Sequence, residues 1–245
     1  GVGFSSSVFI GHNAGGTGAL AGAANVAVGD GAGTDLVAGY NNVLIGGDAG
    51  ANLTDNNDNI AIGKSALDAA NTGEHQNIAI GTNTLGAETS GADGCVAIGH
   101  HALLYQNRND SANTAIGYLA LGNLGNGVSY GGQRNTALGY NASGSGVCGG
   151  SGSTDGDDNV IIGHKAGYAI TTGSDNTIMG SYAGEDITAG NGNVMVGYNV
   201  GSNLTNAKEN VILGLNACGL GVLANASATE GMYNVVLGSG AGYDL

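Results

Sequence analysis

The side chains that could do chemistry in this chain are few and are spread along its length. The 245 residues include five histidines, ten tyrosines and three cysteines. His12, His100 and His164 each follow a glycine that closes an apolar triplet. Three copies of one such histidine, from three chains, could converge on a metal or an anion. Within one chain they lie several repeats apart, so we expect them to be exposed or to pack between chains, and we expect no metal or cofactor.

Tyrosines occupy the same place in other repeats. Tyr118, Tyr140 and Tyr198 directly follow the recurrent glycine, and Tyr182 lies one residue further along its repeat. Tyrosine rings on a flat polar surface can stack on sugar rings, which makes the first three candidates for surface recognition. The alternative is that these rings cover the edge of the repeat or a seam between chains.

Acidic turns are the remaining chemical candidates. Asp155, Asp157 and Asp158 lie close together, as do Asp55 and Asp58, and such turns can hold Ca²⁺ with backbone carbonyls. A calcium-binding roll would need the same turn in many repeats, so we expect solvated turns instead. No Ser/His/Asp arrangement, carboxylate pair at a cleft or phosphate loop stands out, and the sequence predicts that the protein is not an enzyme.

All of these residues are positioned by a nine-residue phrase, Asn-x-Ala-Ile-Gly-x-x-Ala-Gly/Leu, which recurs thirteen times. Its central glycines are 17 to 24 residues apart, and such a period marks stacked coils. We expect an all-β protein, a parallel β-roll or β-solenoid of about 13 coils in a single domain over residues 1–245. Positions are numbered from the Asn as position 0. The central glycines, at position 4, are Gly11, Gly29, Gly46, Gly63, Gly81, Gly99, Gly117, Gly139, Gly163, Gly180, Gly197, Gly214 and Gly238.

Apolar residues fill positions 1, 2 and 3. Positions 1 and 3 are mostly Val and Ile and share one side of a strand, which we expect to face the interior of the coil. Position 2 points the other way yet is apolar too, and a strand that is apolar on both faces is covered twice. Since the chain offers no helices for this, we expect another copy of it to provide the second cover. The candidate inter-chain face is Ala61, Ala79, Ala97, Ala115 and Ala137.

The other positions predict local structure. Glycine at position 4 should end the strand at a bend where a Cβ would clash or φ must be positive. A short second strand should follow, with Ala at position 7. The Asn side chains at position 0 should stack into a hydrogen-bonded ladder from coil to coil. Longer loops are expected near residues 122–134, 144–158 and 219–233.

Composition excludes several classes of protein. The chain has 50 glycines and no proline, and the glycines are not at every third residue, so it is not collagen. A net charge of −14 with only five Lys and Arg argues against a nucleic-acid partner. No apolar run of 18 residues is present, so we expect no membrane insertion. The scattered cysteines are expected to be small buried hydrophobes. Gly1 in place of an initiator Met, and Leu245 straight after a repeat, indicate a mature product or an excerpt of a longer chain.

Two coils carry a resemblance to known proteins. Asn113-Thr-Ala-Ile-Gly-Tyr-Leu-Ala-Leu121 and Asn135-Thr-Ala-Leu-Gly-Tyr-Asn-Ala-Ser143 resemble the β-roll heads of trimeric autotransporter adhesins. They resemble repeat regions of bacteriophage tail-fibre proteins still more. The resemblance covers nearly the whole chain and is specific for the fold. It implies a homotrimer.

The sequence therefore predicts a structural and attachment protein, a segment of an extracellular or virion-surface fibre that binds a cell-surface glycan or receptor. The alternative is a subunit of a self-polymerising extracellular filament. An ice-binding solenoid would need a regular threonine array, whereas position 1 offers only Thr114, Thr136 and Thr177. We expect the protein outside the cell, at a cell surface or on a virion. Bacterial and viral origins are both open.

Overall fold

The computed structural model describes residues 6–16, 22–69, 73–87, 92–105, 111–124, 132–145, 156–219 and 231–242. It confirms the expected all-β parallel β-solenoid, and the described residues contain no helix. The chain divides into two compact units, Gly1–Asn113 (unit 1) and Thr114–Leu245 (unit 2), which are described separately.

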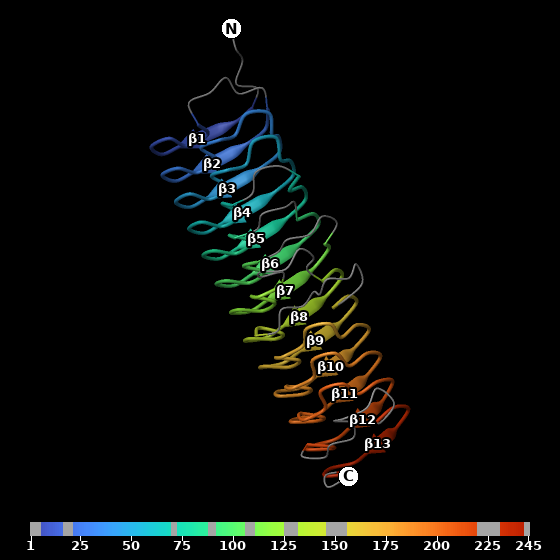
Figure 1. The fold of residues 1–245 in the computed structure, drawn as a ribbon. Coiled ribbons are helices and arrows are strands. Elements are labelled where there is room, and N and C mark those ends of the chain that lie inside the picture. Colours follow the sequence, from blue (N-terminus) through green and yellow to red (C-terminus); the bar gives the residue numbers. More distant parts are fainter. Residues whose placement is uncertain are drawn as a thin grey trace. The chain divides into compact units, whose positions relative to one another are not determined.

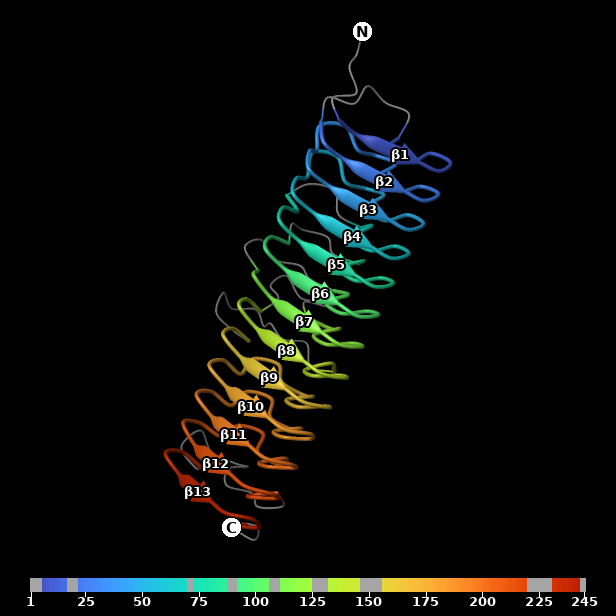
Figure 2. The ribbon, with the colours of Figure 1, turned by 180° about the vertical axis from the view of Figure 1, so that it is seen from behind.

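The strands of each unit pair side by side in chain order, all parallel (Figure 1; Figure 2 shows them from behind). Every strand covers positions 1 to 3 of its phrase, and residues at the same position pair, as Ala61 does with Ala79. The period of the sequence is therefore the register of the sheet. Unit 1 holds β1 (Val8–Ile10), β2 (Val26–Val28), β3 (Val43–Ile45), β4 (Ile60–Ile62), β5 (Ile78–Ile80) and β6 (Val96–Ile98). Unit 2 holds β7 (Thr114–Ile116), β8 (Thr136–Leu138), β9 (Val160–Ile162), β10 (Thr177–Met179), β11 (Val194–Val196), β12 (Val211–Leu213) and β13 (Val235–Leu237).

Glycine at position 4 ends every strand, for both of the expected reasons. Its φ lies between +119° and +144° in all thirteen coils, a region that residues with a Cβ rarely adopt. The space is also closed, since a Cβ on Gly63 would lie 2.5 Å from the carbonyl oxygen of Gly81 in the next coil. The structural role predicted for these glycines is confirmed.

The strand turns the opposite face to the interior from the one expected. Position 2 lies inside the coil, and Ala61, Ala79, Ala97, Ala115 and Ala137 are all 0% exposed. The Val and Ile residues at positions 1 and 3 point outward and are partly exposed. The alanine line is therefore not an outer, inter-chain face. A strand of three residues has two side chains on one side and one on the other, and the narrow interior of this coil accepts the single one.

In most coils the residues at positions 2 and 8 are complementary in size, so that a large residue at one accompanies a small residue at the other. A Cβ added to Gly50 would lie 2.7 Å from Leu44 Cδ2, so position 8 faces position 2 across the interior. Large residues at position 2, such as Leu44 and Ile161, accompany glycine at position 8 in every coil but one, where Ile212 accompanies Cys218. Alanine at position 2 accompanies a fully buried leucine at position 8 in four coils, namely Leu67, Leu85, Leu103 and Leu121.

The second strand expected after the glycine is not formed; the described residues there make consecutive turns. Positions 6 and 8 are both left-handed, as in Asn83 (φ +52°) and Leu85 (φ +46°), which a strand does not allow. Backbone bonds still join these turns between coils, as from Leu67 N–H to the Thr84 carbonyl (2.9 Å). Residues 125–131, 146–155 and 220–230, which include most of the three longer loops, lie outside the described residues.

The asparagine ladder is confirmed and is buried in both units. Asn59 donates from its backbone N–H (3.0 Å) and from Nδ2 (3.2 Å) to Oδ1 of Asn42. Its Nδ2 also donates to the carbonyl of Glu74 (2.8 Å), so one side chain joins two coils and closes its own. Cys95 takes the place of the asparagine in one coil and keeps the bond from its N–H to Asn77 Oδ1 (2.9 Å). Cys95 and Cys218 are fully buried thiols, as expected, and Cys148 lies outside the described residues.

Candidate functional site

The outer face of the sheet carries two columns of mostly apolar side chains in each unit, at positions 1 and 3. We call these the outer columns. Ile45 is 38% exposed in unit 1, and Leu138 is 43% exposed in unit 2. The strand is thus apolar on both faces, as the sequence predicts, but the face left open is the one with two side chains per coil. In unit 1 the outer columns consist of Val8, Val26, Val43, Ile60, Ile78 and Val96 at position 1, and of Ile10, Val28, Ile45, Ile62, Ile80 and Ile98 at position 3.

Five rings of unit 2 form a line along its coils, which we call the aromatic line. Tyr118 and Tyr140 stack with centroids 5.2 Å apart and planes at 9°. Tyr140 and His164 stack at 5.3 Å and 17°. Tyr182 then meets His164 edge-on at 5.0 Å and Tyr198 edge-on at 6.1 Å. The structure therefore brings the three candidate recognition tyrosines into one row and adds two rings to them.

Tyr182 continues the aromatic line although its sequence position differs. Its coil has Ser181 at position 5, and the ring comes from position 6, where the backbone is left-handed (φ +59°). Lys165 lies beside the line, with Nζ 5.7 Å from the Tyr182 ring centroid and 3.9 Å from Glu185 Oε1. Tyr118, Tyr140 and Tyr198 are 43%, 48% and 52% exposed, so the row is open to solvent.

Within one chain, the histidines at position 5 do not gather into a metal site. His12 Nδ1 lies 3.1 Å from Asp30 Oδ1 at an exposed position, and His100 packs against His101 with ring centroids 3.8 Å apart. His164 belongs to the aromatic line. Among the described residues, no group of three or more His, Cys, Asp or Glu side chains is placed to hold a metal ion.

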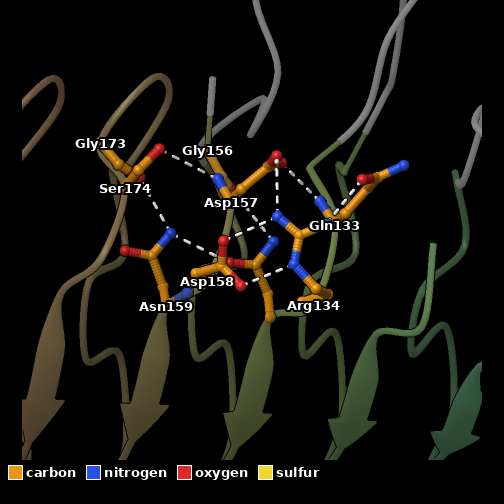
Figure 3. Close-up of polar contacts among 9 residues, drawn as sticks. Gln133, Arg134, Gly156, Asp157, Asp158, Asn159, Gly173 and Ser174 are labelled. Carbon is orange, nitrogen blue, oxygen red and sulfur yellow. Dashed lines mark hydrogen bonds and ion pairs between the residues drawn. The ribbon is translucent and has the colours of Figure 1, made fainter. Parts of the chain in front are cut away.

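The acidic turn before Asn159 is used internally (Figure 3). Arg134 donates to both carboxylate oxygens of Asp158, from Nε and Nη2, at 2.7 Å each. This hydrogen bonding lowers the pKa of the Asp158 carboxyl. Asp157 accepts the backbone N–H of Gln133 (2.7 Å) and lies 3.4 Å from Arg134 Nη2. These two carboxylates are thus engaged by donors of their own chain, and Asp155 lies outside the described residues.

The hydrogen bond from the Gln133 N–H to Asp157 belongs to a second ladder, which was not predicted from the sequence. At position −2, two residues before the asparagine, a side-chain acceptor receives the backbone N–H of the same position in the preceding coil. His75 Nδ1 accepts from Asn57 (3.1 Å), and Asp93 accepts from His75 (2.7 Å). In unit 2, Ser174 Oγ accepts from Asp157 (3.1 Å) (Figure 3). The sequence feature that could have revealed this ladder is the recurrence of polar residues, such as Asn57, Asp93 and Ser174, at position −2 of successive coils.

A shallow depression in unit 1 lies over this second ladder. Its lining includes Tyr40, Asn57, Asp58, His75, Gln76 and Asp93. Glu74, which directly precedes the lining residue His75, is 1% exposed and accepts a hydrogen bond from Asn56 Nδ2. Burial raises the pKa of Glu74 from 4.5 to about 7. The depression is open, and its ladder residues are already bonded to one another.

Comparisons with protein-family models, curated proteins and solved structures found no match for this chain. In the part of the chain that the structure describes, no helix has the length and apolar character needed to cross a membrane.

Proposed function

We propose that this chain is a segment of an extracellular or virion-surface fibre, with a structural and an attachment role. Copies of the chain assemble through the outer columns, in the manner of the trimeric fibres that its repeat resembles. No bond-making or bond-breaking step is part of the proposal.

The observation that carries the proposal is the open apolar face of a parallel sheet. Parallel sheets are normally covered on both faces, and contiguous apolar surface on a soluble protein marks an interaction site. The outer columns carry no charged residue in either unit, and the charged residues of the described segments all lie outside the thirteen strands. The columns continue through every strand of a unit, so a partner that covers them must extend along the whole stack of coils.

A second copy of the chain is the occupant that fits this face. Its own columns repeat once per coil, at the spacing of about 4.8 Å that neighbouring strands impose. Two such faces therefore keep their side chains in step along the whole stack, which a compact partner with irregular side chains would not do. The same argument favours a closed assembly of parallel copies over a chance contact.

The test is the molar mass in solution, measured by light scattering over a hundredfold range of protein concentration. We expect a fixed oligomer, and we expect Ile62→Lys to convert it to a folded monomer, because a charge in an outer column would have to be buried. Gln76→Lys adds the same charge on an exposed turn and should leave the mass unchanged. Mass that grows without limit would favour the self-polymerising filament. A monomer at every concentration would overturn the proposal.

A further inference from the structure

We propose that the aromatic line of unit 2 binds a neutral, extended polysaccharide that lies along the coils, with successive sugar units over successive rings. This inference deepens the attachment role proposed above. It rests on side chains other than those of the outer columns, so the two can fail separately.

The rings at one end of the line are stacked, whereas Tyr182 meets its two neighbours edge-on. Tyr118 and Tyr140 have nearly parallel planes but centroids 5.2 Å apart, whereas aromatic carbons in contact lie about 3.5–4.0 Å apart. The longer centroid distance fits a sideways offset of the two rings, which would leave part of each face uncovered. The exposure of Tyr118, Tyr140 and Tyr198, about half of each side chain, fits this arrangement. A surface of partly open aromatic faces is suited to the C–H face of a sugar ring.

The spacing of the line is fixed by the backbone. The carbonyl of Tyr118 accepts the N–H of Asn141, and that of Tyr140 accepts the N–H of Lys165, both at 2.9 Å. His164 and Tyr198 accept from the next coil at the same distance. The rings are thus held in step before any ligand arrives, which reduces the entropy lost on binding.

The resulting ring-to-ring distance, between 5.0 and 6.1 Å, is comparable to the length of one pyranose unit in an extended chain. A straight β-linked chain can therefore keep its sugars in step with the rings. A coiled α-linked chain would leave the line after one or two units. The linear geometry selects the extended class.

Polar groups beside the rings suit sugar hydroxyls. The tyrosine hydroxyls can donate and accept, and Lys165 and Glu185 add a donor and an acceptor close to Tyr182. The opposite charges of that pair give no net attraction for an ion. The chain charge of −14 repels polyanions such as nucleic acids and acidic glycans, which leaves a neutral glycan as the fitting ligand.

The test uses cello-oligosaccharides and chito-oligosaccharides of two to six units, with maltohexaose as the coiled comparison. The chain has no tryptophan, so tyrosine fluorescence can be followed without interference, and calorimetry gives the affinity; four of the ten tyrosines belong to the line. We expect affinity for at least one extended series to rise with each added unit, and maltohexaose to bind at least tenfold more weakly. Tyr140→Ala should weaken binding of the hexamer about tenfold, because one stacking surface in the middle of the line is lost. Tyr140→Phe should retain most of it.

Tyr233→Ala is the matched control, since Tyr233 is 70% exposed but lies outside the aromatic line, and it should bind as the parent does. Melting curves and the second variant Tyr118→Ala guard against a folding defect. The proposal is overturned if neither series binds, if Tyr140→Ala binds normally, or if assembly of the chain buries the rings. Measurement of the molar mass distinguishes failure of this proposal from failure of the fibre proposal. Ile62→Lys should lose assembly and keep binding to the glycan. Tyr140→Ala should keep assembly and bind the glycan weakly.

Discussion

At the scale of single residues, Glu74 shows how a solenoid interior treats an ionisable group. Its carboxyl is 1% exposed at a position where most coils have Gly or Ala, and Asn56 in the preceding coil donates a hydrogen bond to it. Loss of solvent raises its pKa to about 7, and the nearby charges of Asp93 and Asp55 act in the same direction. The protonated form is therefore the one that the fold prefers.

The stability of unit 1 should consequently depend on pH through Glu74. Its pKa in the folded chain lies above the ordinary value of 4.5, so its stabilising contribution is complete below about pH 4.5 and is lost as the pH rises through about 7. We expect the free energy of unfolding to fall by about 2–3 kcal/mol between pH 5 and pH 8.5. Urea unfolding at the two values measures this.

Glu74→Gln should remove most of that pH dependence, since the amide stays neutral. Asp68, whose pKa is also raised by burial, accounts for a smaller part in the same direction. Glu185→Gln changes a partly exposed carboxylate of unit 2 and serves as the control. An unchanged pH slope in Glu74→Gln would show that this carboxyl is ionised in the folded chain throughout the range.

At the scale of the coil, the sequence predicted the elements better than their orientation. The strands, the bend at each glycine and the asparagine ladder all follow from residue types at fixed positions, because each needs one particular chemistry. The faces did not follow, since three consecutive apolar residues contain no alternation that separates inside from outside. The left-handed leucines, such as Leu85, were also missed because leucine carries no signal for that conformation. The aromatic line was partly predictable from Tyr118 and Tyr140, but Tyr182 enters it only through the folded geometry.

The paired sizes of positions 2 and 8 predict a compensating exchange within one coil. Ala79→Leu alone should cost about 1–3 kcal/mol, because it overpacks the interior against Leu85. Leu85→Gly alone should cost about 2–4 kcal/mol for the cavity, slightly offset by relief of the left-handed strain. The double variant reproduces the Leu44 and Gly50 arrangement of an existing coil and should be within about 1 kcal/mol of the parent.

Denaturant unfolding of the four proteins gives the coupling between the two sites. Ala79→Leu combined with Leu121→Gly, which lies in unit 2, provides the comparison, and there the two losses should add. Additive losses in the Ala79 and Leu85 pair would contradict the view that these side chains share one space.

At the scale of the whole molecule, the distribution of polarity separates two surfaces with different roles. The outer columns are mostly apolar, uncharged and continuous along each unit, whereas the aromatic line is half exposed and has polar neighbours. An apolar face gains from contact with a like face, while a row of rings and hydroxyls suits a ligand that must also be released. The two proposals therefore assign assembly and attachment to separate parts of each coil.

Assembly through an uncharged face makes a specific prediction about salt. Each copy carries a net charge of −14, so association brings like charges together in the turns while the contact itself contains no ion pair. Salt shortens the range of that repulsion from about 30 Å at 0.01 M to about 3 Å at 1 M. We expect the dissociation constant of the oligomer to fall at least tenfold between about 0.02 M and 0.5 M sodium chloride, measured by light scattering on dilution. Ile62→Lys should stay monomeric at both. An oligomer that dissociates as salt is added would instead be held by ion pairs, and the outer columns would not be its interface.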